Sequence, residues 1–124
     1  MSLQSSEPEP TGDCYEAAGR YVQDATLTGD AGNLTLVHGV VSGQGPLEGR
    51  RIGHAWVEVS TSHEEISLVV DRSQGQNLVL MRGDYYRLGQ IDPNECKRYT
   101  PEEAIIEMVR SEHWGPWEGV SSDD

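Results

Sequence analysis

The chain has 124 residues, which suits one domain around a single hydrophobic core and leaves no room for a second lobe. Its 21 acidic residues against 9 basic ones give a formal net charge of -12, and this field repels nucleic-acid phosphates and anionic membrane surfaces. No stretch approaches the roughly 20 apolar residues of a membrane span, and the start of the chain lacks the basic and apolar parts of a secretory signal. We therefore expect a cytoplasmic protein that binds neither nucleic acid nor membranes.

The two ends of the chain offer a core almost nothing to bury. Residues 1–10 combine Ser, Pro and Glu and predict a disordered leader, and residues 119–124 (GVSSDD) predict a disordered tail. One domain is expected between them, over residues 11–118. The two cysteines, Cys14 and Cys96, are too few for a disulfide framework, so each is expected as a free thiol.

The first predicted element is a helix from Cys14 to Gln23. Asp13, followed three residues later by Glu16, has the form of a capping box, which marks a helix start. Apolar residues then recur at helical spacing, at Tyr15, Ala18 and Val22. Cys14 would thus open a solvent-accessible helix start, where free N–H groups and the helix dipole stabilise a thiolate.

Strand-like segments follow. The predicted strands are Leu34–Val41, Arg51–Ser60, Ile66–Asp71 and Asn77–Arg82, and Asp84–Ile91 (DYYRLGQI) is a candidate for a fifth. Hairpin-length links between them favour an antiparallel sheet.

The strand Arg51–Ser60 (RIGHAWVEVS) has a particularly clear alternation. It predicts one face with Ile52, His54, Trp56 and Glu58, and an opposite face with Gly53, Ala55, Val57 and Val59.

A second helix is predicted to begin at Thr100, which is followed by proline at the first helical position and Glu103 at the third. It is expected to end near His113, before a Gly-Pro pair. Its predicted apolar face consists of Ala104, Ile105, Met108 and Val109.

Three residues have the chemistry of a nucleophilic site. Cys14 is the candidate nucleophile, and a histidine must act as its base. His54 lies on a predicted strand, and Asp71 ends the next strand, 71 − 54 = 17 positions later. Neighbouring antiparallel strands can bring the two together, so that the carboxylate orients the imidazole.

A helix-starting Cys, the strand Gly53–Glu58 (GHAWVE) and a strand-end Asp resemble the transglutaminase-like branch of the papain-like cysteine enzymes, in the same order along the chain. The likeness covers roughly Asp13 to Asp71, and the compact chain is most similar to small stand-alone members from bacteria or phages. It implies an α+β fold with a papain-like core, in which the Cys helix packs on an antiparallel sheet and a C-terminal helix follows. It also implies that Cys14 is the nucleophile, His54 the general base and Asp71 the orienting residue.

The chain departs from that family in one respect. Papain-like enzymes commonly carry an oxyanion-stabilising Gln shortly before the Cys, and here only Gln4 precedes it. Another donor would have to come from Trp56, Gln44 or Gln90. Tyr86 is a candidate wall of a substrate cleft, so Trp56, Gln44 and Tyr86 are the predicted substrate-binding residues, and a mobile flap is expected around Gln44.

These observations predict a hydrolase or acyl transferase that acts on an amide or isopeptide bond of a peptide or protein through a thioester at Cys14. The alternative is a catalytically silent papain-like module that binds a protein partner. His38 would join the three site residues in a metal site, but the short paired spacings of zinc ligands are missing, so no metal and no cofactor are expected. Cys96 is expected to be incidental.

Overall fold

The computed structural model describes residues 12–42, 50–61 and 67–117. The predicted leader, the predicted tail and Gln44 lie outside these ranges. The described elements are α1 (Gly12–Thr28), β1 (Leu34–Ser42), β2 (Arg51–Ser60), β3 (Ser67–Asp71), the 3-10 turn η3 (Ser73–Gly75), β4 (Leu78–Met81), α2 (Arg82–Gly89), the 3-10 turn η4 (Pro93–Glu95), β5 (Lys97–Tyr99) and α3 (Pro101–Ser111).

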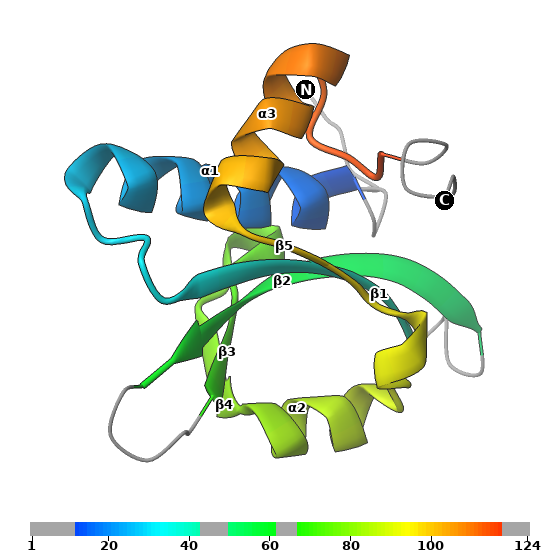
Figure 1. The fold of residues 1–124 in the computed structure, drawn as a ribbon. Coiled ribbons are helices and arrows are strands. Elements are labelled where there is room, and N and C mark those ends of the chain that lie inside the picture. Colours follow the sequence, from blue (N-terminus) through cyan, green and yellow to red (C-terminus); the bar gives the residue numbers. More distant parts are fainter. Residues whose placement is uncertain (1–11, 43–49, 62–66, 118–124) are drawn as a thin grey trace.

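The architecture is α+β. The described strands form one antiparallel sheet in the order β4-β3-β2-β1-β5. Figure 1 shows that α1 and α3 lie on one side of this sheet and α2 on the other. The sheet is therefore covered on both faces, and hydrophobic side chains are buried in two layers.

The alternation predicted for β2 is confirmed, because its side chains divide between these two layers. Ala55 and Val57 pack in the layer under α1, whereas Trp56 packs in the layer above α2 together with Val69 and Tyr85. Each side chain on β2 is thus assigned a face by its position in the sequence.

The candidate strand over Asp84–Ile91 is wrong, because most of this segment forms α2. The consecutive residues Tyr85 and Tyr86 both contact the Trp56 ring, with centroids 5.2 and 5.9 Å away. Consecutive residues of a strand point to opposite faces, whereas consecutive residues of a helix are only about 100° apart and can face the same sheet. The outer strand β5 was not predicted, since three residues carry too little pattern.

The helix at Thr100 is confirmed with its capping box: the Thr100 hydroxyl accepts from the Glu103 N–H, and the Glu103 side chain accepts from the Thr100 N–H. Ala104 and Met108 are buried as predicted. Val109 is 72% exposed, so its place on the apolar face is wrong. The buried face of α3 is therefore narrow and consists mainly of Ala104 and Met108, which are four positions apart.

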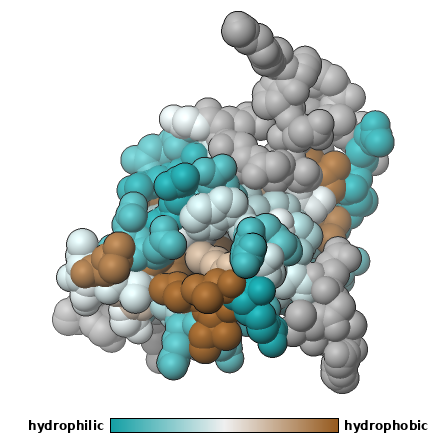
Figure 2. All heavy atoms as spheres, turned by 90° about the horizontal axis from the view of Figure 1, so that it is seen from above, coloured by the Kyte–Doolittle hydropathy of each residue, from teal (hydrophilic) through white to brown (hydrophobic). Residues whose placement is uncertain are grey.

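Hydrophobic side chains are also exposed on the side formed by α1 and α3. Figure 2 views the molecule from this side and shows them in separate patches among hydrophilic residues. The most exposed large apolar residues of these two helices are Leu27, Ile106 and Val109. Scattered apolar residues of this kind are usual on protein surfaces.

Candidate active site

Cys14 lies in the first turn of α1, as the third residue of that helix. The N–H groups of a first helical turn lack partners within the helix and carry the positive end of its dipole, which favours a negatively charged sulfur. The helix begins two residues before the predicted start, so Asp13 lies inside it rather than at the cap. Cys14 is 1% exposed and packs in the layer between α1 and the sheet, so the expected solvent-accessible position is wrong. A substrate can reach this sulfur only if the surrounding structure opens.

His54 lies on β2 at a point that the described part of β3 does not reach. The last pair between these strands is Val57 with Val70, and His54 is three residues farther along β2. No described strand therefore pairs with this edge of β2 beside His54. Asp71 at the end of β3 and Cys14 on α1 both reach the His54 ring at this position.

The structure brings the three predicted site residues together. His54 Nε2 lies 2.9 Å from Asp71 Oδ2, and the Cys14 side chain forms a hydrogen bond with His54. Since Nε2 faces the carboxylate, Nδ1 is the ring nitrogen left for the thiol. A thiol, an imidazole and a carboxylate thus form a hydrogen-bonded series of the kind that nucleophilic catalysis requires.

The surroundings of His54 favour the imidazolium. Burial by itself would lower its pKa, but the hydrogen bonds to Asp71 and Cys14, together with the charges of these two groups, raise the pKa to about 9. Burial would likewise raise the pKa of Asp71, whereas its hydrogen bond and attraction to His54, and the donors of Ser73, hold that pKa well below its ordinary value. The pair is therefore an ion pair at neutral pH.

Asp71 has two further partners that sequence reasoning missed. Ser73 donates to Oδ1 from its hydroxyl at 2.7 Å and from its backbone N–H at 3.0 Å. The Tyr85 hydroxyl donates to Oδ2 at 2.7 Å. The spacing Asp-x-Ser is a local signal for the first contact, because Asp side chains often accept from the N–H two residues on. No local signal existed for Tyr85, whose segment resembled a strand.

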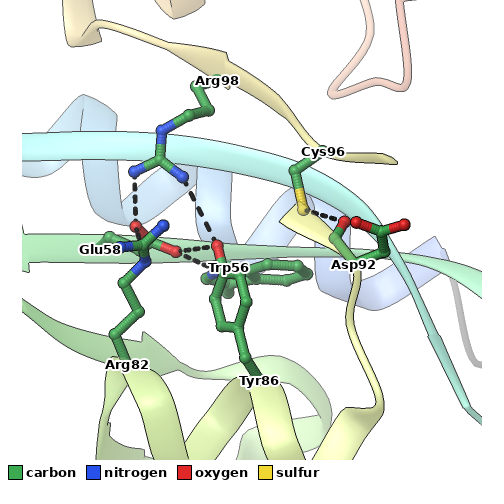
Figure 3. A network of polar contacts seen from close by, with 7 residues as sticks. All are labelled: Trp56, Glu58, Arg82, Tyr86, Asp92, Cys96 and Arg98. Atoms are coloured by element: carbon green, nitrogen blue, oxygen red, sulfur yellow. Dashed lines mark hydrogen bonds and ion pairs between the residues drawn. The ribbon is translucent and has the colours of Figure 1, made fainter. Parts of the chain in front are cut away.

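Two of the predicted substrate-binding residues serve another site. The Trp56 Nε1–H and the Tyr86 hydroxyl both donate to Glu58 Oε2, at 3.0 and 2.6 Å. Glu58 is only 3% exposed, and Arg98 and Arg82 lie 2.6 and 3.4 Å from its Oε1. Figure 3 shows these side chains converging on Glu58 from β2, α2 and β5. Trp56 is fully buried and its N–H is already used, so it is not free to stabilise an oxyanion.

Of the remaining candidates for an oxyanion donor, Gln44 lies outside the described residues and Gln90 lies within them. The Gln90 side chain accepts from the Ser42 hydroxyl at 3.0 Å, and its backbone carbonyl accepts from Arg51. These contacts hold Gln90 beside the end of β1.

His38 is separate from the group formed by Cys14, His54 and Asp71. It lies on the α1 face of the sheet among aromatic rings, with centroids 4.8 Å from Tyr15 and 5.0 Å from Trp117. Burial, followed by the charge of Lys97, lowers its pKa to about 4. Within residues 12–42, 50–61 and 67–117, no group of three or more His, Cys, Asp or Glu side chains is arranged to hold a metal ion.

Gly53 relieves crowding under α1. A Cβ atom at this position would lie 2.8 Å from the Tyr15 hydroxyl oxygen. The absence of a side chain at Gly53 thus leaves space for the helix that carries Cys14.

No family model, curated protein or solved structure matches this chain. Across the part of the chain that the structure describes, no helix is both long enough and apolar enough to cross a membrane. Because no match suggests a function, the proposal below rests on the geometry of the site.

Proposed function

We propose that the protein is a cysteine-dependent hydrolase or acyl transferase with a papain-like, transglutaminase-like core, and that it acts on an amide or isopeptide bond. The observation that carries this proposal is His54, which is hydrogen-bonded to both Cys14 and Asp71. A part-buried imidazole between a thiol and a carboxylate contributes little to stability that apolar packing could not supply. It is the arrangement that generates a thiolate and stores a proton beside it.

The reaction would proceed in two halves. The Cys14 thiolate attacks the carbonyl carbon of the amide, and the His54 imidazolium protonates the leaving nitrogen, so that an amine or ammonia departs and a thioester remains. Neutral His54 then accepts a proton from water or from an acceptor amine as that nucleophile attacks the thioester. Hydrolysis or amide transfer results, and the thiolate and imidazolium are restored.

The proposed substrate is a peptide or protein, and the proposed location is the cytoplasm, where Cys14 and Cys96 would remain free thiols. The competing proposal is a silent papain-like module that binds a protein partner. It is favoured by the burial of Cys14, which is 1% exposed.

One experiment separates the two proposals. Wild-type protein is incubated with short peptides that carry Gln or Gly before a reporter amine, and intact mass spectrometry detects an acyl-enzyme. Ammonia release against amine incorporation then distinguishes a deamidase from a cross-linking enzyme. Under our proposal Cys14→Ala abolishes the adduct, and His54→Ala removes most of it. No adduct with any peptide, together with unchanged partner capture by Cys14→Ala, would establish the binding module.

A further inference from the structure

The Asp71 carboxylate is shared between the candidate catalytic histidine and a tyrosine from the opposite layer. Its Oδ2 atom accepts from the Tyr85 hydroxyl at 2.7 Å and lies 2.9 Å from His54 Nε2. Tyr85 belongs to α2, on the side of the sheet away from α1, and both Tyr85 and Asp71 are almost fully buried. The second oxygen, Oδ1, accepts from the Ser73 hydroxyl and from its backbone N–H.

Packing explains the Tyr85 ring but not its hydroxyl. The ring centroid lies 5.2 Å from that of Trp56, and phenylalanine would fill the same space. The neighbouring Tyr86 provides a comparison inside the same helix, because its hydroxyl donates to Glu58 at 2.6 Å. Two consecutive tyrosines of α2 thus donate to two different buried carboxylates, and only one of these carboxylates contacts His54.

The Tyr85 hydroxyl is a permanent donor. Burial, reinforced by the charge of Asp71 and the hydrogen bond to it, raises the Tyr85 pKa far above its ordinary value. The proton therefore stays on the phenol oxygen and points at Asp71. Such a donor draws charge from Oδ2 that would otherwise act on His54.

We infer that Tyr85 is a positioning residue of the candidate site: it holds the Asp71 carboxylate against His54 and moderates the negative charge that this carboxylate presents to the imidazole. Among the described residues, the titratable groups that act on His54 are Cys14 from α1 and Asp71 from β3, and Tyr85 acts through Asp71. The inference rests on the proposed function for its catalytic meaning, because the proton on His54 is the one that the leaving nitrogen receives.

The test is an NMR titration of histidine-labelled full-length protein, which needs no substrate. In Tyr85→Phe the undiminished charge of Asp71 acts on His54, so we expect the His54 midpoint to rise by about 0.5 pH unit or more. The matched control is Tyr86→Phe, which removes the part-buried hydrogen bond from the neighbouring tyrosine to Glu58 and leaves the His54 midpoint unchanged. Replacing Tyr85 by 3-fluorotyrosine, a stronger donor of nearly equal size, lowers the midpoint and covers the case in which Tyr85→Phe does not fold.

Equal midpoints in wild type and Tyr85→Phe, or equal shifts in the Tyr85 and Tyr86 variants, would overturn the inference and leave Tyr85 a packing residue. A midpoint that does not fall with 3-fluorotyrosine would also overturn it. These readouts are independent of turnover. A protein that forms no acyl-enzyme yet shows the shift rejects the proposed function while retaining the role of Tyr85 toward His54.

Discussion

Asp71 Oδ2 lies 2.9 Å from His54 Nε2, although the two residues are 17 positions apart and belong to different strands. The contact joins a nearly buried imidazole to a carboxylate that two hydroxyls and a backbone N–H also hold. Replacing Asp71 should therefore change a quantity that can be measured directly, the pKa of His54.

Asp71→Asn should lower the pKa of His54, because an amide supplies no negative charge to stabilise the imidazolium. We expect acylation at Cys14 to fall by roughly tenfold to a hundredfold, less than in His54→Ala. The His54 midpoint from NMR and the rate of acyl-enzyme formation check this. An unchanged midpoint would mean that the ion pair does not form in solution.

Cys14 and Cys96 should differ in their reaction with iodoacetamide at about pH 6. Cys14 is paired with His54, whereas burial raises the pKa of the Cys96 thiol, whose S–H points to the Asp92 carbonyl 3.6 Å away. Transient opening of the site should therefore label Cys14 first, and His54→Ala should slow that labelling about tenfold or more. Peptide mapping by mass spectrometry assigns the adducts. Labelling of Cys96 alone would show that the Cys14 sulfur stays closed or protonated.

Gly53→Ala should destabilise the domain by about 1–3 kcal/mol, because the new methyl group would lie 2.8 Å from the hydroxyl of the buried Tyr15. Tyr15 follows Cys14, so either the Tyr15 side chain or the first turn of α1 must shift. Adding Tyr15→Phe should recover much of the loss when the double variant is compared with Tyr15→Phe alone. Urea unfolding measures each step, and a glycine that tolerates alanine without cost would contradict the close contact.

Glu58→Gln should cost about 2–4 kcal/mol at neutral pH, because it leaves the donors of Trp56, Tyr86 and Arg98 without a common carboxylate. The control is Glu16→Gln, whose ion pair with Arg20 is exposed and should contribute less than about 0.5 kcal/mol. Chemical denaturation compares the two.

The Glu58 effect should also depend on pH. Burial alone would raise its pKa, but the hydrogen bonds from Tyr86, Trp56 and Arg98 outweigh burial and lower it. A folded-state pKa below the unfolded one contributes stability above the ordinary value of 4.5, and this contribution is lost as the pH falls. The difference between wild type and Glu58→Gln should therefore shrink between pH 6 and pH 3. A constant difference would place the effect in packing rather than charge.

Local sequence patterns predicted correctly those features that depend on residues close together in the chain. The alternation of β2 placed His54 and Trp56 on one face, and the spacing from Thr100 to Glu103 located the start of α3. Both depend on a fixed backbone period or on a hydrogen bond between residues three positions apart, which residue types alone specify.

The tertiary structure decided what depends on distant partners. As a helix, the segment of Tyr85 and Tyr86 allows both hydroxyls to donate to carboxylates on β3 and β2, whereas a strand would present these consecutive side chains to opposite faces. Packing of α1 over β2 buries Cys14, which the sequence placed at an accessible helix start. The sequence determined by itself which residues carry a thiol, an imidazole and a carboxylate in that order. The tertiary structure decided that the three side chains meet. The pairing of β3 with β2 ends before His54, where Asp71 and Cys14 reach the ring, and no local sequence pattern predicts where a neighbouring strand ends.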